Sequence, residues 1–214
     1  MSDSPRLQPL FFRAWKAKSA CAAGVVAYYI VGYFTLNRFP FQTYHDVLKV
    51  PFLDDLPLIP WTTVVYNSVF VLAALGIGLL PDERAVKRYF VSVMIAYTLN
   101  YVFFALYPTQ IIRDPLPESG SMWLWALQLT RDADGPYTCF PSLHLTNCTL
   151  VVIGHWHTRY GRWFLFWTLA IAVSTLTTDQ HLFLDLPAGA VMALVGSSLA
   201  RTILERRRGR LPAG

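Results

Sequence analysis

The sequence predicts an all-α integral membrane protein, a bundle of six transmembrane helices with both termini in the cytoplasm. Of its residues 54% are apolar and only 14% are charged, whereas about 25% of the residues of a soluble domain are charged. The apolar residues also gather in runs, and Trp residues stand near the ends of several of them, as is typical of membrane helices. The six runs are 20–36, 61–80, 89–106, 143–156, 163–177 and 186–204.

Two of these runs, 143–156 and 163–177, are short for a membrane crossing. A helix rises about 1.5 Å per residue, so a crossing takes about 20 residues. The missing length must come from polar residues at the ends of the two runs. We therefore expect a polar site that lies slightly below the membrane surface.

The basic residues predict the orientation of the bundle. If the N-terminus is inside, the inner segments hold fourteen of the 18 Lys and Arg residues, and the outer segments hold Arg38, Lys49, Arg113 and Arg131. Inner segments of membrane proteins are enriched in Lys and Arg, so the reverse orientation is strongly disfavoured. The outer side then receives the three polar loops 37–60, 107–142 and 178–185.

We expect a single domain, 1–214, in which the basic segments 1–19 and 205–214 lie outside the bundle. No signal-peptide cleavage pattern follows the first basic residues, so the first run is expected to stay in the protein. The three Cys residues include no CxxC pair and predict neither a zinc site nor a disulfide framework. We expect membrane lipids as partners, no nucleic acid, and neither a metal nor another cofactor.

The outer loop 178–185 contains the strongest candidate for chemistry, His181 followed four residues later by Asp185. A carboxylate in this position can select the tautomer of the imidazole and stabilise the charge that the ring acquires. The alternative is that Asp185 caps the last helix ahead of Pro187, beside an interfacial His.

The segment from Cys139 to His144 enters the fourth run. Pro141 and Ser142 are typical of a helix start, and the N-terminus of a helix favours a bound anion. His144 in the first turn would face that anion. The alternative is an ordinary helix cap with an interfacial His.

Arg113 shortly follows the third run on the outer side. Arginine suits bidentate recognition of phosphate, although a snorkelling side chain or a pair with Asp114 is the alternative. This residue, together with Ser142, His144, His181 and Asp185, would supply the groups that phosphoryl transfer without a metal requires. One His attacks phosphorus, the other protonates the leaving oxygen, and Arg and helix N–H groups stabilise the charge.

These segments resemble the signature of the type 2 phosphatidic acid phosphatase superfamily, whose motifs run Lys-x6-Arg-Pro, Pro-Ser-Gly-His and Ser-Arg-x5-His-x3-Asp. Here the second reads Pro141-Ser142-Leu143-His144, and the third reads Ser174-Thr175, five residues, His181, three residues, Asp185. The resemblance implies a six-span bundle in which His181 is the nucleophile and forms a phosphohistidine. It implies Asp185 as the residue that orients His181 and His144 as the general acid and base.

The sequence departs from this signature at its cationic positions. Asp114 separates Arg113 from the Pro, Leu106 stands at the Lys position, and Thr175 stands where a second Arg is expected. The pattern is in this respect similar to the branch of inositol phosphorylceramide and sphingomyelin synthases. The residues that we expect to bind phosphate or substrate are Arg113, Ser142, Leu143, Thr175 and Gln180.

We therefore expect a membrane enzyme that hydrolyses a lipid phosphate or phospholipid in the outer leaflet through a phosphohistidine. Transfer of a phospholipid head group to a lipid alcohol is one alternative, and a non-catalytic lipid-binding or transport protein with the same fold is another. The small size and short loops favour a bacterial plasma membrane, with the site on the periplasmic side.

Two further features have simpler interpretations. Asp132 and Asp134 before Gly135 look like a fragment of a calcium loop, but the other acidic ligands are missing, so a solvated turn is expected. Asn100 is a polar residue within the third run and is expected to bridge two helices.

Overall fold

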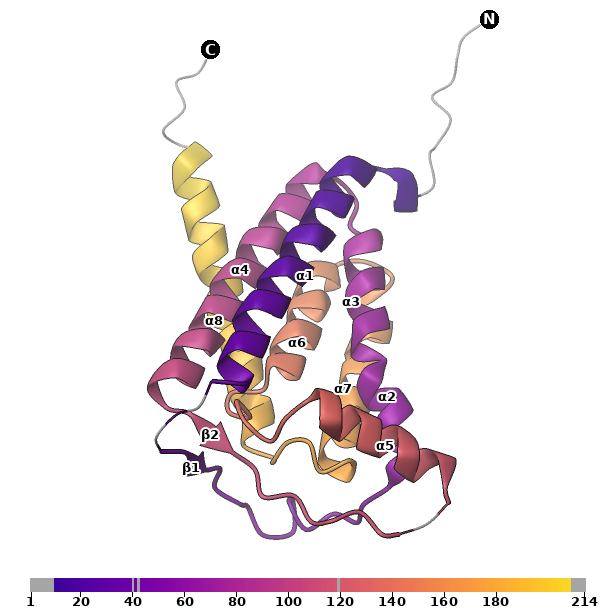
Figure 1. Ribbon diagram of the computed structural model, residues 1–214. Helices are drawn as coiled ribbons and strands as arrows, with labels where there is room; N and C mark the ends of the chain where they lie inside the picture. Colours follow the sequence, from indigo (N-terminus) through magenta and orange to yellow (C-terminus); the bar gives the residue numbers. More distant parts are fainter. Residues whose placement is uncertain (1–9, 40, 42, 119, 209–214) are drawn as a thin grey trace, which may run out of the picture.

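The computed structural model describes residues 10–39, 41, 43–118 and 120–208. The chain is mostly helical, and its long helices stand side by side in one bundle (Figure 1). The start of α1 and the end of α8 lie at the same end of the bundle. The elements in chain order are η1 Leu10–Phe12, α1 Trp15–Asn37, β1 His45–Asp46, η2 Pro60–Thr62, α2 Thr63–Asn67, α3 Val69–Gly78, α4 Glu83–Leu106, β2 Thr109–Gln110, α5 Met122–Ala133, α6 Leu143–His155, α7 Gly161–Thr177 and α8 Asp185–Arg208.

Four helical segments are long and apolar enough to cross a membrane: Trp15–Asn37, Pro60–Gly78, Glu83–Leu106 and Asp185–Arg207. They correspond to four of the six runs in the sequence. Helices α6 and α7 have 13 and 17 residues and are shorter than these segments, as the short runs in the sequence predicted. Many apolar side chains remain exposed on the outside of the bundle, among them Val31, Phe70 and Phe166, as expected where helices face lipid rather than water.

Helix α8 packs closely against two other helices because it has Gly at both contacts. A Cβ atom on Gly196 would lie 2.7 Å from that of Ala96 in α4. A Cβ atom on Gly189 would lie 2.2 Å from the carbonyl oxygen of Ser142 at the start of α6. The absence of a side chain at these positions allows the backbones to approach, as at other helix contacts in membranes.

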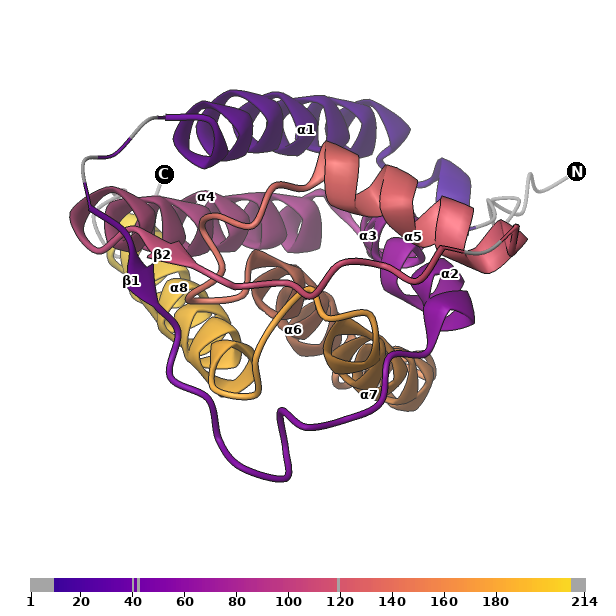
Figure 2. The ribbon, with the colours of Figure 1, turned by 60° about the horizontal axis from the view of Figure 1, so that its bottom comes forward.

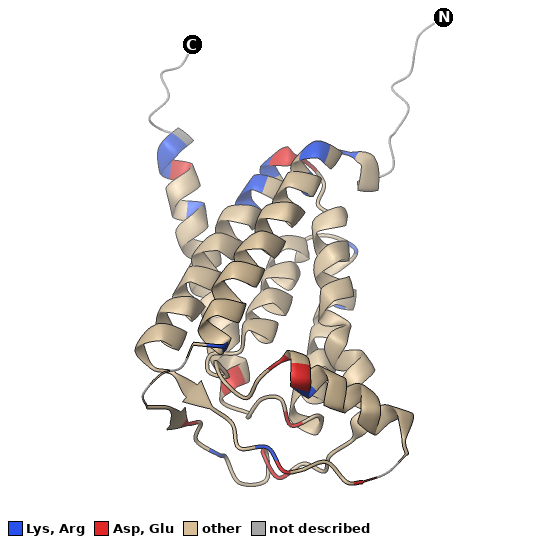
Figure 3. Ribbon diagram, viewed as in Figure 1, with Lys and Arg blue, Asp and Glu red and all other residues tan. Residues whose placement is uncertain are grey.

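The two ends of the bundle differ in charge (Figure 3). Lys and Arg gather at the end that holds the start of α1 and the end of α8, while the other end carries several Asp and Glu residues. Of the basic segments expected outside the bundle, residues 1–9 and 209–214 lie outside the described part of the chain. Helix α1 already begins at Trp15, and the buried Nζ of Lys18 donates to the carbonyls of Leu10 and Gly78, 2.7 Å from each.

Loops and the short helix α5 cover the acidic end of the bundle (Figure 2). Helix α5 lies within the loop 107–142, and its Trp123 and Trp125 are exposed. Strands β1 and β2 pair in parallel and join the first two loops. Asp54 accepts hydrogen bonds from the backbone of Val50 and Phe183, both at 2.6 Å. The first loop is thus attached to the segment that carries His181.

Candidate active site

His181 lies in the loop between α7 and α8, and Asp185 begins α8. Nδ1 of His181 is 3.1 Å from Oδ2 of Asp185, which also accepts from the backbone N–H of Leu182 at 2.9 Å. Asp185 is fully buried. Because a carboxylate accepts hydrogen bonds, Nδ1 carries the proton and the lone pair of the ring is at Nε2.

Nε2 of His181 faces the start of α6. It is 3.2 Å from Oγ of Ser142 and 3.4 Å from Nδ1 of His144. Oγ of Ser142 also accepts from the backbone N–H of Leu145 at 3.3 Å, so Ser142 caps α6 as the sequence predicted. The backbone N–H of Ser142 donates to the carbonyl of Asp185 at 3.0 Å, which joins the two segments directly.

The loop that carries His181 is supported by the last turns of α7. The carbonyl of Thr175 accepts from the backbone N–H groups of Gln180 at 3.0 Å and His181 at 3.2 Å. The hydroxyl of Thr175 donates to the carbonyl of Ala172 within α7 at 2.7 Å. Thr175 therefore contacts His181 through its backbone, while its side chain is occupied inside its own helix.

A buried polar contact holds α8 against α6 beneath the site. Oγ1 of Thr146 lies 2.9 Å from the carbonyl oxygens of both Ser142 and Gly189. Nδ2 of Asn100 in α4 donates to the same hydroxyl at 3.2 Å. This contact confirms the prediction that Asn100 bridges two helices. It joins α4, α6 and α8 near the start of α6.

A carboxylate that sequence reasoning missed lies close to His144. Asp134 accepts hydrogen bonds from the hydroxyls of Tyr33 in α1 and Tyr66 in α2, the latter at 2.7 Å. The ring of Tyr66 is 4.5 Å from the ring of His144 between centroids. The prediction of a solvated turn at Asp134 is therefore wrong, because two distant tyrosines bind its carboxylate.

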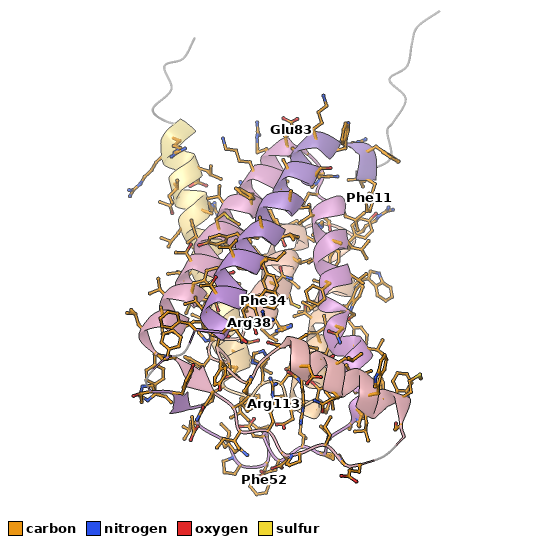
Figure 4. All side chains as sticks on the ribbon, viewed as in Figure 1. Phe11, Phe34, Arg38, Phe52, Glu83 and Arg113 are labelled. Atoms are coloured by element: carbon orange, nitrogen blue, oxygen red, sulfur yellow. The ribbon has the colours of Figure 1, made fainter. Side chains whose placement is uncertain are left out.

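Arg113 does not contact the two histidines directly. Its Nη1 donates to the carbonyl of Asp134 at 2.8 Å and its Nη2 to that of Gly135 at 3.5 Å. The side chain lies among the loops at the acidic end of the bundle (Figure 4). Arg113 thus binds the segment that carries Asp134 and does not contact the imidazole rings of His144 and His181.

A second arginine, Arg131 in the last turn of α5, lies against the loop that carries His181. Its Nη2 is 3.0 Å from Oδ2 of Asp179, and its Nη1 donates to the carbonyl of Asp114 at 2.8 Å. The sequence showed Arg131 only as one of the four outer basic residues. Its partner Asp179 is distant in the sequence, so no local pattern could have revealed the pair.

Gln180, which immediately precedes His181, is only 1% exposed. Neither its amide oxygen nor its amide nitrogen has a hydrogen-bond partner among the described residues, and the same holds for Oδ1 of Asp185. Buried polar groups without partners are costly and usually have a reason. Within the part of the chain that the structure describes, no group of three or more His, Cys, Asp and Glu residues is arranged to hold a metal ion.

An apolar cleft between α1 and α3 leads to His144. Val26 and Tyr29 of α1 and Phe70 of α3 line it, and Leu143 and His144 stand at the start of α6 on its wall. Val26 and Phe70 are exposed on the outside of the bundle. Leu143 therefore belongs to an apolar passage from the side of the bundle to one of the two histidines.

A comparison with protein families agrees with this geometry. The family model described as the PAP2 superfamily matches residues 44–199, which is more than half of the chain and includes all eight predicted site residues. The chain belongs to the PAP2 superfamily. No curated protein and no solved structure matches the chain.

Members of the PAP2 superfamily are phosphoesterases or phosphotransferases, which supports a phosphatase-type enzyme. The apolar helices and the family together support a membrane protein. In this PAP2 protein the two histidines, the buried carboxylate and the capped start of α6 form one compact group. Such a group can combine a nitrogen nucleophile, a proton donor and an anion site.

Proposed function

We propose that the protein hydrolyses a phosphorylated lipid, with Nε2 of His181 as the nucleophile that attacks phosphorus. The observation that carries this proposal is the position of the His181 ring, with Nδ1 held by Asp185 and Nε2 beside Ser142 and His144. Because Asp185 accepts the Nδ1 proton, the Nε2 lone pair is available, and the carboxylate offsets the charge of the phosphorylated ring.

The reaction has two steps. Attack by Nε2 of His181 forms a P–N bond and breaks the P–O bond to the lipid, while His144 gives a proton to the leaving oxygen. His144 then takes a proton from water, whose oxygen attacks phosphorus and breaks the P–N bond, which releases phosphate. The hydroxyl of Ser142 and the free N–H groups at the start of α6 stabilise the charge on the phosphoryl oxygens.

The apolar cleft supports a lipid rather than a soluble phosphate ester as the substrate. It passes between α1 and α3, and its wall includes His144. Because Val26 and Phe70 of this cleft are exposed on the outside of the bundle, a lipid chain could enter it from the bilayer without passing through water. Leu143 and Phe70 would contact the lipid chain while its phosphoryl group lies at the histidines.

We place the site on the outer side of the membrane, with α6 and α7 as the fourth and fifth crossings in chain order. The gathering of Lys and Arg at the end of the bundle opposite the site supports this orientation (Figure 3). The exposed Trp residues of α5 suit a helix that lies at the membrane surface. A substrate in the outer leaflet would then reach the site from the side.

Phosphate release from a panel of lipid phosphates tests the proposal, with detergent-purified protein and a chelator present. His181→Ala removes the nucleophile, and we expect loss of phosphate release and of a base-stable, acid-labile phosphoprotein. His157→Ala is the matched control, because His157 is exposed and follows the end of α6, whereas His144 lies at its start. This variant should retain the wild-type rate.

Three outcomes would contradict the proposal. Full phosphate release by His181→Ala would exclude this nucleophile. A new phosphorylated lipid in place of free phosphate, when donor and acceptor lipids are mixed, would establish a phosphotransferase. Retained lipid binding without any product from the panel would indicate a non-catalytic binding protein.

A further inference from the structure

Arg131 is a buried cation with incomplete hydrogen bonding. Its side chain is only 9% exposed. Its two terminal nitrogens bind Asp179 and the carbonyl of Asp114, but Nε has no partner among the described residues. Burial of a guanidinium group is costly unless its donors are satisfied. The incomplete set of partners indicates that Arg131 is placed for an additional acceptor.

Arg113 adds a second positive charge to the same region. It donates to the backbone carbonyls of Asp134 and Gly135, and its Nε is also buried without a partner. Burial lowers the pKa of Arg131, and the like charge of Arg113 contributes in the same direction. Among the described residues, Asp179 is the only carboxylate that forms an ion pair with either arginine. The pair of arginines therefore carries one positive charge more than its direct partner neutralises.

These groups lie on or against the loop of the nucleophile. Asp179 stands two residues before His181. Its backbone has a φ of 57°, in the left-handed region that residues other than Gly rarely adopt. Between them is Gln180, whose buried amide has no partner. Unsatisfied donors of Arg131 and Gln180 thus lie on or against the short segment that ends at His181. Arg113 is near enough for its charge to act on Asp179. Phosphate oxygens are the acceptors that such donors bind most strongly.

We propose that Arg131, together with Arg113, binds the phosphoryl oxygens of the substrate and that Asp179 occupies Arg131 while the site is empty. A phosphoryl group with two negative charges competes for Arg131 against a carboxylate with one. Asp179 then acts as a competitor of the substrate and not only as a support for the loop. This inference deepens the proposed function and rests on it for the reaction. The binding of an anion by Arg131 does not depend on the proposed function.

The two members of the ion pair allow a test in which the expected effects have opposite signs. The probe is inorganic phosphate, and its dissociation constant is measured by calorimetry on the full chain in detergent. Arg131→Gln removes the cation and should weaken binding about tenfold, as expected for one lost charge-assisted hydrogen bond. Asp179→Asn removes the competitor and should tighten binding. Arg131→Lys keeps the charge and should recover part of the affinity.

Arg38→Gln is the matched control, because Arg38 is an exposed cation over the ring of Phe34, toward the same end of the bundle (Figure 4). It should leave the dissociation constant unchanged. A melting temperature for each variant establishes that the protein remains folded. Weaker binding in both Arg131→Gln and Asp179→Asn would overturn the inference, because a purely structural ion pair predicts that result. An equal loss in Arg38→Gln would also overturn it, since the effect would then be one of general charge.

Phosphate binding and lipid hydrolysis separate this inference from the proposed function. Opposite effects of Arg131→Gln and Asp179→Asn on phosphate binding support the anion site even if no lipid phosphate is hydrolysed. Conversely, hydrolysis that depends on His181 but shows the same KM in Arg131→Gln as in the wild type overturns the role of Arg131 and leaves the proposed function intact.

Discussion

Gly189→Ala tests whether the close approach of α8 to α6 assembles the site. The new Cβ atom would lie 2.2 Å from the carbonyl oxygen of Ser142, 3.1 Å from its carbonyl carbon and 3.2 Å from the backbone nitrogen of Thr146. All three atoms belong to the backbone, so no side chain can rotate away. Restoring ordinary contact requires α8 to move away from α6 by roughly 1 Å, because packed interiors have no spare volume.

That movement would separate the two halves of the site. His181 and Asp185 move with the start of α8, whereas Ser142 and His144 belong to α6. A misplacement of about 1 Å can cost about a hundredfold in rate. We therefore expect Gly189→Ala to lower kcat for phosphate release about a hundredfold while the helical content, measured by circular dichroism, is retained.

Two glycine variants serve as controls for this experiment. In Gly154→Ala the new Cβ would lie 3.4 Å from Tyr89 and would make ordinary contacts, so kcat should not change. Gly196→Ala overpacks α8 against Ala96, far along the helix from the site, and should lower the melting temperature more than kcat. A kcat within twofold of wild type for Gly189→Ala would refute the reasoning, as would an equal loss in Gly154→Ala.

Two further substitutions address the groups beside the histidines. Asp185→Asn should lower kcat about a hundredfold or more, since an amide no longer selects the Nδ1–H tautomer of His181. Asp132→Asn, which changes an exposed carboxylate, is the control. Equal rates for both variants would contradict the role of Asp185. Tyr66→Phe removes a donor to Asp134 and should lower the free energy of unfolding by about 1–3 kcal/mol. The value of kcat should be nearly retained because the ring beside His144 stays. An unchanged melting temperature would show that this hydrogen bond is not needed for stability.

Local features of the sequence predicted most of the fold and part of the site. Apolar runs predict helices wherever their length and composition suffice, and four of them match helical segments that can cross a membrane. The four-residue spacing of His181 and Asp185 allowed their contact to be predicted, because only three residues separate His181 in the loop from Asp185 at the start of α8. The cap at Ser142 followed from the Pro and Ser before an apolar run in the same way.

Contacts between distant segments were not predictable from local patterns. Arg131 and Asp179 are separated by 48 residues, and Asp134 lies 101 residues from Tyr33 and 68 from Tyr66. No periodicity or motif links such positions, since their partners depend on how α5 crosses the end of the bundle. For this reason Asp134 was expected in a solvated turn, and Arg131 was counted only as an outer cation.

The sequence by itself determined the helical class and the segments that carry His144, His181 and Asp185, because helix formation and capping depend on neighbouring residues. Only the tertiary structure decided how these segments meet. Gly189 lets the backbones of α8 and α6 approach, and Thr146 lies between their carbonyls. Close packing brings Nε2 of His181 to Ser142 and His144, and this depends on the shapes of two helices together rather than on either sequence alone.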